Sequence, residues 1–404
     1  MEIPFFLFIA TGIIGIYMAW NIGANDVSNS MASAVGARAI TLKQAILIAA
    51  VLDFIGAVFI GSHVTDTVRK GIVDPLGIAD PLSLALGTLS ALLGAGIWVT
   101  IATWKSLPVS TTHSIVGALV GFGLVSGGKE VIKWNKVTHI VLSWIISPLF
   151  SCILAILIFR IIVVFILKKR SREALLKISP LLTGMTTFIV TLSLFLKTPL
   201  SQKLPLNPFT SSLGLTLIGS LLGFFWTKKL IQRKVGIEGI FRKLQIMTSC
   251  YVALAHGAND VANAVGPMAT VYSVLRSGVV ALKVTVPLWM LAVGGMGIAL
   301  GVTTWGYRVI STLGSKITTL TNTRGFTIDF STATSILISS KLGMPVSTTH
   351  AVVGAVVGVG LARGLEAVDL RVVRRILYSW FLTLPVSALS TILIYQGLFP
   401  IFRR

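Results

Sequence analysis

A six-residue sequence rich in hydroxyl groups occurs twice in this chain. Pro-Val-Ser-Thr-Thr-His stands at residues 108–113 and again at residues 345–350, and we call it the hydroxyl motif. Each copy follows an apolar stretch and precedes a run of small residues. Proline followed by Ser and Thr predicts the start of a helix, because hydroxyl oxygens cap the first free amides and proline has no N–H to cap.

A helix that begins in apolar surroundings is suited to binding an anion. It offers unpaired N–H groups, hydroxyl donors and the positive end of the helix dipole, all of which a tetrahedral oxyanion can use. In the simpler alternative, the hydroxyls only cap the helices or bond back to carbonyls. Because both copies are identical, we favour the binding site, whose candidate residues are Ser110, Thr111, Thr112, Ser347, Thr348 and Thr349.

A second motif, Gly-Ala-Asn-Asp-Val, stands at residues 23–27 and 257–261, and we call it the acidic motif. Asn and Asp offer hard oxygen ligands, which suit cations such as Na⁺. The leading glycine predicts a break in the helix that would release backbone carbonyls as further ligands. An ionised carboxylate inside a bilayer costs at least ~3 kcal/mol and usually marks an ion or proton pathway. The candidate cation ligands are Asn25, Asp26, Asn259 and Asp260; the alternative is a carboxylate held by amides for helix packing.

Four further polar residues lie in apolar stretches. Asp53 and Asp329 are not repeat partners, and each could complete a cation site, carry a proton or make an interhelical hydrogen bond. His113 and His350 end the two hydroxyl motifs. Interhelical hydrogen bonding is the simplest role for these histidines, with anion contact or proton coupling as alternatives. The sequence has no Cys/His cluster with metal-binding spacing.

The composition predicts a membrane protein that crosses the bilayer many times. Of 404 residues, 54% are apolar and 12% are charged, and the mean hydropathy is +0.89. The net charge of +21 comes from basic residues placed between apolar runs, which is typical of cytoplasmic anchors rather than of nucleic-acid binding. We expect an all-α fold with about 12 transmembrane helices, at residues 3–20, 41–62, 83–102, 108–125, 137–167, 181–196, 210–227, 244–258, 284–305, 326–340, 344–362 and 376–399.

The distribution of Lys and Arg predicts the orientation. The two most basic stretches, residues 168–172 and 228–243, are placed in the cytoplasm, with two spans between them. Continuing the alternation outward places both the N-terminus and the C-terminus on the extracytoplasmic side.

The duplicated motifs predict two repeats of five crossings each, joined by two crossings. An odd number in each half makes the halves face opposite ways, as in secondary transporters, where the substrate site forms at the repeat interface. We therefore expect an N-terminal repeat at 1–167, cytoplasmic loops with two linking helices at 168–243, and an inverted C-terminal repeat at 244–404, with broken or re-entrant helices at the interface.

The motifs, with His-Gly-Ala-Asn-Asp-Val-Ala-Asn at 256–263, resemble those of the inorganic phosphate transporter (PiT) family. The resemblance implies cation-coupled import of inorganic phosphate by alternating access, with Na⁺ as the coupling ion and no prosthetic group. It also implies that the protein is a homodimer and is not an enzyme. It implies phosphate at the six hydroxyl-motif candidates and Na⁺ at the four acidic-motif candidates, with Asn21, Asn29 and Asn263 nearby.

Several details and alternatives accompany the resemblance. Ser28 stands where the family usually has Ala, and Asp53 and Asp329 stand where many members have Glu. The chain lacks the long hydrophilic central loop of eukaryotic members, which favours a bacterial or archaeal cell membrane. The open alternatives are a proton-coupled phosphate symporter, a metal–phosphate symporter, a sulfate permease of the same fold, a membrane phosphate sensor and an intramembrane phosphatase.

Overall fold

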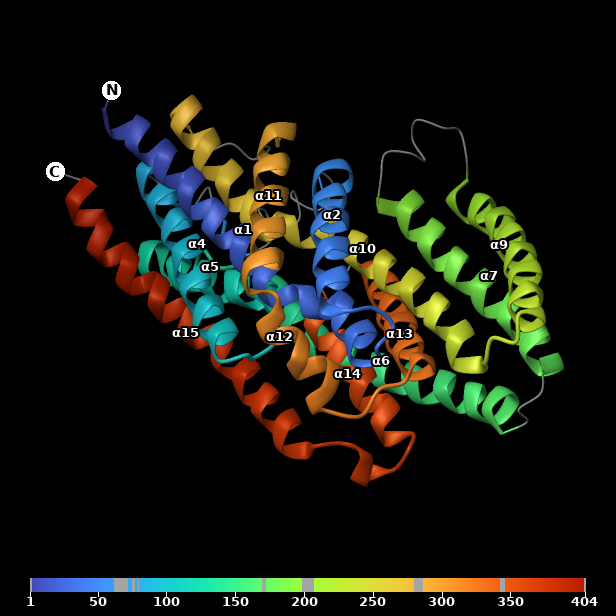
Figure 1. The fold of residues 1–404 in the computed structure, drawn as a ribbon. Coiled ribbons are helices and arrows are strands. Elements are labelled where there is room, and N and C mark those ends of the chain that lie inside the picture. The colour runs from blue at the N-terminus through green and yellow to red at the C-terminus, as the bar shows by residue number, and fades with distance from the viewer. Residues whose placement is uncertain are drawn as a thin grey trace.

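The computed structural model describes residues 2–61, 72–74, 77–78, 80–168, 172–197, 207–279, 286–341 and 346–402. These residues are helical apart from turns and one isolated antiparallel bridge between Val73 and Ile132. Figure 1 shows the helices, and it places both ends of the chain at the same end of the molecule.

The helices of the first part of the chain are α1 (Glu2–Gly36), α2 (Leu42–Ile60), α4 (Pro81–Trp104), α5 (Thr111–Gly127), α6 (Trp134–Ile162) with the π-helical η2 (Val163–Leu167), α7 (Arg172–Lys197) and α9 (Pro208–Gln232). Those that follow are α10 (Ile237–Ser277), α11 (Leu288–Trp305), α12 (Tyr307–Ser311), η3 (Thr312–Lys316), α13 (Asn322–Lys341), α14 (Thr348–Leu361), η4 (Leu365–Ala367) and α15 (Leu370–Phe402).

The all-helical, membrane-spanning character of the fold is confirmed. Within the described residues, 8 helices are long and apolar enough to cross a bilayer, and α5 and α14 are shorter apolar helices. Large apolar side chains such as Ile145, Leu222 and Phe381 are exposed on the outside, as expected of a surface that faces lipid. Every predicted span overlaps a helix, whereas the number of crossings remains a prediction.

The predicted helix break at the acidic motif is wrong. Helix α1 continues through Gly23, and α10 continues through Gly257. The glycines serve close packing instead, because a Cβ on Gly23 would overlap the backbone of Ile298, and a Cβ on Gly257 would overlap the backbone of Asp53. Helix α1 therefore lies tightly against α11, and α10 lies tightly against α2.

The predicted helix starts at the hydroxyl motifs are confirmed. Ser110 is the N-cap of α5, and its Oγ accepts a hydrogen bond from the amide of His113 at 3.2 Å. Ser347 caps α14 in the same way, accepting from the amide of His350 at 3.2 Å. The proline of the second motif, Pro345, lies outside the described residues.

The two short helices pack on their long neighbours through matching glycines. Gly117 on α5 lies against the backbone of Leu384 on α15. Gly354, at the corresponding position of α14, lies against the backbone of Pro148 on α6. The same close contact thus occurs twice, and each time it joins a short helix of one half of the chain to a long helix of the other half.

Candidate anion and cation site

The two hydroxyl motifs meet in the interior of the protein. Thr349 Oγ1 donates a hydrogen bond to the backbone carbonyl of Val109 at 3.3 Å, across 240 positions of sequence. Both residues are buried. The fold therefore brings the starts of α5 and α14 together, as the sequence predicts for a site shared between the repeats.

Asp26 on α1 joins the two helix starts. Its Oδ2 accepts from Thr111 Oγ1 at 2.6 Å, and its Oδ1 accepts from Thr349 Oγ1 at 3.5 Å. The side chain is fully enclosed, since Asp26 is only 1% exposed. One carboxylate thus accepts a hydrogen bond from a hydroxyl group of each copy of the hydroxyl motif.

Asp260 on α10 makes a comparable contact. Its Oδ2 accepts from Thr348 Oγ1 at 3.4 Å, and the residue is buried. Asn259 beside it is half-buried and lines a cavity of about 10 Å³ together with His256 and Thr348. A space of this size holds about one water molecule or one small ion.

Two asparagines cross from one half of the chain to the other. Asn29 on α1 donates its Nδ2 to Thr348 Oγ1 at 3.2 Å and to Thr349 Oγ1 at 3.0 Å, both at the start of α14. Asn263 on α10 donates to Thr112 Oγ1 at 3.1 Å, at the start of α5. Each acidic helix therefore positions the hydroxyl motif of the opposite half.

Asn25 holds the turn that precedes α5. Its Nδ2 donates to Thr103 Oγ1 at 2.9 Å and to the Leu107 carbonyl at 3.0 Å, and its Oδ1 accepts from the Val109 amide at 3.1 Å. Asn21, one turn earlier on α1, accepts from Thr100 Oγ1 at 2.8 Å. These two amides fix α1 to α4, so the hydroxyl motif is held where Asp26 can reach it.

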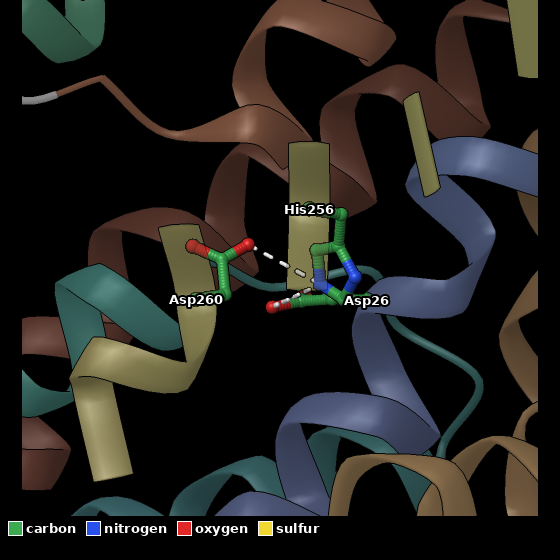
Figure 2. Close-up of side chains that lie close together, drawn as sticks. All are labelled: Asp26, His256 and Asp260. Atoms are coloured by element: carbon green, nitrogen blue, oxygen red, sulfur yellow. Dashed lines mark ion pairs between the residues drawn. The ribbon is translucent and has the colours of Figure 1, made fainter. Parts of the chain in front are cut away.

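His256 on α10 is a central residue of the site that the sequence analysis did not select. Its Nδ1 lies 3.1 Å from Asp53 Oδ1 on α2. Its Nε2 lies 3.2 Å from Asp260 Oδ2 and 3.9 Å from Asp26 Oδ2, and Figure 2 shows both carboxylates directed toward this nitrogen. The four-residue spacing from His256 to Asp260 on one helix was the signal available in the sequence.

Asp329 on α13 belongs to a separate polar cluster. Its Oδ1 accepts from Ser33 Oγ at 2.5 Å, and its Oδ2 accepts from Ser249 Oγ at 2.5 Å and from Thr248 Oγ1 at 3.4 Å. Three hydroxyl donors satisfy this buried carboxylate, whereas Asp53 is bound by His256. The two additional acids therefore lie in different surroundings.

The two motif histidines stack against tryptophans behind the helix starts. The ring centroids of His113 and Trp144 are 3.5 Å apart, and so are those of His350 and Trp380. The histidine rings meet edge to face at 4.3 Å. His350 Nδ1 lies 3.1 Å from the Trp144 carbonyl, which agrees with the predicted interhelical hydrogen bonding, and Trp380 Nε1 donates to the Pro108 carbonyl at 3.1 Å.

The charges of the site favour cation binding. Asp26, Asp53 and Asp260 are all buried around the single imidazole of His256. Buried carboxylates are costly unless cations or hydrogen bonds compensate them, and one imidazole cannot balance three. The same interior presents hydroxyl donors and two helix N-termini, which attract an anion. The arrangement can therefore hold cations and an oxyanion next to each other.

Comparison with known proteins places this chain among transporters. The sequence model of the phosphate transporter family matches residues 22–391. A protein of Pyrococcus abyssi named "Putative phosphate permease" is 51% identical over 394 residues, covering 96% of each chain. The Arabidopsis thaliana protein named "Inorganic phosphate transporter 2-1, chloroplastic" is 39% identical over 430 residues, covering 96% of this chain and 72% of its own.

A solved structure agrees with these sequence matches. The structure titled "The sodium-dependent phosphate transporter" superposes with a TM-score of 0.90 at 46% identity, covering 98% of this chain and 99% of its own. The duplicated motifs, the all-helical fold and these matches lead to one conclusion: the chain belongs to the phosphate transporter family, whose members are permeases and not enzymes.

Proposed function

We propose that this protein imports inorganic phosphate together with Na⁺, by alternating access of a single site to the two sides of the membrane. The observation that carries the proposal is the convergence of Thr111 and Thr349 on the carboxylate of Asp26. Both threonines belong to helix starts suited to an oxyanion, while the carboxylate is suited to a cation. Coupling between the two solutes follows from this shared contact.

The cation is expected to bind first. Without it, the carboxylates of Asp26 and Asp260 repel phosphate, and the threonine hydroxyls are committed to these carboxylates. Na⁺ at Asp26 and Asp260, with oxygens of Asn25 and Asn259 as further ligands, would neutralise this charge. A hydroxyl group is both donor and acceptor, so Thr111 could then turn its proton toward phosphate.

The phosphate would lie between the starts of α5 and α14. Ser110 and Ser347 each accept an amide hydrogen bond as N-caps, which leaves their own hydroxyl protons to donate. Thr112 and Thr348 are held by Asn263 and Asn29, so their oxygens are fixed in position. The first amides of each helix add donors that have no partner within the helix.

The membrane potential sets the smallest number of Na⁺ ions that must accompany each phosphate. An inside-negative potential opposes anion entry by about 2.3 kcal/mol per charge per 100 mV. Accumulation of phosphate therefore requires at least enough Na⁺ to neutralise it. One further cation would make each cycle electrogenic and would couple uptake to the potential as well as to the Na⁺ gradient.

We also propose that residues 1–167 and 244–404 are inverted repeats, joined by 168–243, with about 12 membrane helices in all and with broken or re-entrant helices at the repeat interface. The crossed contacts of Asn29 and Asn263 support this arrangement. So does the matching packing of α5 on α15 and of α14 on α6. Rocking of two such halves would open the site to each side in turn.

The remaining assignments extend this proposal. We place the protein in a cell membrane as a multi-pass homodimer with both termini extracytoplasmic, on the basis of the charge distribution and the family resemblance. Proton coupling is the second candidate mechanism, because His256 contacts three carboxylates within the site.

Uptake of labelled phosphate into proteoliposomes tests the proposal. An inward Na⁺ gradient at equal pH should drive accumulation, and an imposed inside-negative potential should show whether the cycle is electrogenic. A pH gradient without Na⁺ should give no accumulation, and excess sulfate should not compete. Uptake driven by pH alone would establish proton symport, strong competition by sulfate would establish a different substrate, and binding without uptake would indicate a sensor.

A further inference from the structure

We propose that Arg324 and Arg363 form a second anion site, which binds a phosphate group at the end of the molecule opposite the two termini. The site uses no residue of the hydroxyl or acidic motifs. The binding itself is independent of the proposed transport activity, and only its placement in the cytoplasm rests on the proposed orientation.

The site lies where the connection before α13 meets the connection before α15. A cavity of about 910 Å³ opens there, and its lining includes Lys316, Thr319, Arg363 and Arg371. Helix α15 runs from this cavity to the C-terminal end of the chain, so the cavity lies at the other end of the molecule from both termini (Figure 1). With both termini extracytoplasmic, as proposed above, the cavity faces the cytoplasm.

Two arginine side chains converge on one uncharged residue. Arg363 Nη1 donates to Thr319 Oγ1 at 2.9 Å and to the Thr319 carbonyl at 3.4 Å. Arg324 Nη1 donates to the same carbonyl at 2.9 Å and to the same hydroxyl oxygen at 3.4 Å. Two positive charges held this close repel each other, because water at a partly buried position screens them only in part. A bound anion would offset this repulsion.

Arg324 has no carboxylate partner in the described part of the chain. Burial lowers the pKa of its guanidinium, the charge of Arg363 lowers it further, and Glu238 acts in the opposite direction. The carboxylate of Glu238 is engaged elsewhere, since it accepts from the amide of Thr323 at 3.0 Å and from its hydroxyl at 2.8 Å. The Nε atom of Arg324 is buried and has no hydrogen-bond partner among the described residues. This donor is available to a ligand.

The charges that line the cavity leave the arginine pair uncompensated. Asp369 caps α15 by accepting two backbone amide hydrogen bonds, and Glu366 is exposed on η4. The positive charges of Lys316 and Arg371 balance these two acids in number. Neither Arg324 nor Arg363 takes part in an ion pair of the described residues.

The first half of the chain contains a matching connection. The amide of Lys133 donates to the Ile72 carbonyl at 2.9 Å, and the amide of Asp369 donates to the Ile317 carbonyl at 2.9 Å. Each bond stands at the start of the long helix, α6 or α15, that follows the short helix of a hydroxyl motif. The two isoleucines therefore occupy corresponding positions.

The matching connection supplies its own negative charge. Asp74 stands two residues after Ile72, as Thr319 stands two residues after Ile317. The Asp74 carboxylate pairs with Lys133 Nζ at 3.7 Å. In the second half of the chain the corresponding position holds a neutral threonine, although two arginines converge on it. A bound anion accounts for this difference.

The arginine pair determines the class of ligand. A guanidinium is a planar fork of N–H donors that fits the oxygens of a phosphate group. Two uncompensated positive charges match a phosphate monoester, whose charge is about −1.5 to −2 at pH 7, better than a single carboxylate. Leu365 and Leu370, which also line the cavity, are exposed. The phosphate group can therefore belong to a lipid headgroup or to a soluble phosphate.

Calorimetry with glycerol 3-phosphate tests the site, because this probe is the headgroup of phosphatidic acid. The tag-free protein, in phosphatidylcholine nanodiscs and choline buffer, should bind the probe. Arg324→Gln and Arg363→Gln should each weaken binding at least tenfold. Arg233→Gln, which removes an exposed arginine from a basic stretch on the same predicted side, should leave binding unchanged. Absence of binding, or equal losses in all three variants, would overturn the proposal.

A variant that keeps both arginines gives an independent test. Thr319→Asp places a carboxylate where the first half of the chain has Asp74, so it should pair with the arginines and abolish binding of the probe. Thr319→Asn adds no charge and should retain most of the binding. Full binding by Thr319→Asp would contradict the site.

The source of the phosphate group follows from the lipid composition. In nanodiscs that contain phosphatidic acid, loss of probe binding would show that the lipid headgroup occupies the site. Unchanged binding would identify a soluble phosphate as the ligand, and either result supports the site.

Because choline buffer contains no Na⁺, this inference and the proposed function can fail separately. Na⁺-driven phosphate uptake by a protein that does not bind the probe would overturn the second site alone. Probe binding by a protein that shows no Na⁺-driven uptake would support the second site and contradict the proposed function.

Discussion

Thr349 donates a hydrogen bond to the backbone carbonyl of Val109, and this bond joins the two copies of the hydroxyl motif inside the protein. The same hydroxyl lies 3.5 Å from Asp26 Oδ1, so its one proton is shared between the opposite hydroxyl motif and the acidic motif. A single hydroxyl group thus lies where the proposed phosphate and Na⁺ positions meet.

Removing the hydroxyl groups that meet at Asp26 should impair phosphate transport. Thr111→Val and Thr349→Val keep the side-chain shape but lose the donor, and a hydrogen bond to a charged group is worth about 1.5–3 kcal/mol. We expect kcat/KM for phosphate uptake to fall at least tenfold in each variant. Thr111→Ser retains the hydroxyl and should retain most of the activity, whereas equal losses in Thr111→Ser and Thr111→Val would argue against a hydroxyl role.

Neutralising either acidic-motif carboxylate should remove coupling. Asp26→Asn and Asp260→Asn keep the size of the side chain but lose the charge that attracts Na⁺. Uptake driven by a Na⁺ gradient should be abolished in both variants. Asp74→Asn is the matched control, since the Asp74 carboxylate makes a partly exposed ion pair with Lys133. Full Na⁺-driven uptake by Asp26→Asn and Asp260→Asn would remove these carboxylates from the cation site.

Filling the close helix contacts at the acidic motif should destabilise the protein. In Gly23→Ala and Gly257→Ala, the new Cβ would overlap the backbones of α11 and α2, and such overpacking costs about 1–3 kcal/mol. Thermal unfolding in detergent should occur at a lower temperature for both variants. Gly12→Ala, also on α1, has open space around its Cβ and should be neutral or slightly stabilising. If Gly23→Ala and Gly257→Ala unfold at the same temperature as the unaltered protein, the packing role of these glycines would be contradicted.

Trp380 should help to hold the turn before α5. Trp380→Phe keeps an aromatic ring to stack on His350 but loses the Nε1 donor to the Pro108 carbonyl. The loss of one buried hydrogen bond should cost about 1–3 kcal/mol in the free energy of unfolding. Trp289→Phe, which changes an exposed tryptophan, serves as the control in the same unfolding measurement. Equal stability of both variants would show that this bond contributes nothing.

The local parts of the site were predictable from the sequence. The starts of α5 and α14 follow from Ser110 and Ser347, because N-capping depends on residues within one turn. The duplication was visible because both motifs are repeated in order. Residues whose roles arise from contacts within one helix or from identical repeats are accessible to sequence reasoning.

Contacts between distant helices were not predictable from one sequence. The pair of His256 and Asp53 spans 203 positions and depends on the packing of α10 against α2. The helix break expected at Gly23 does not occur, because tertiary packing against Ile298 explains the glycine. Helix α1 also extends beyond the predicted apolar run to Gly36, since its polar residues face the protein interior rather than lipid.

Binding of phosphate to the purified protein, measured by calorimetry at several Na⁺ concentrations, tests the central claim most directly. Na⁺ beside phosphate would neutralise the carboxylates of Asp26 and Asp260, so it should strengthen phosphate binding, and phosphate should strengthen Na⁺ binding by the same factor. We predict at least tenfold tighter phosphate binding in saturating Na⁺ than in choline, and loss of this difference in Asp26→Asn. Equal phosphate affinity with and without Na⁺ in the unaltered protein would contradict the proposed joint site.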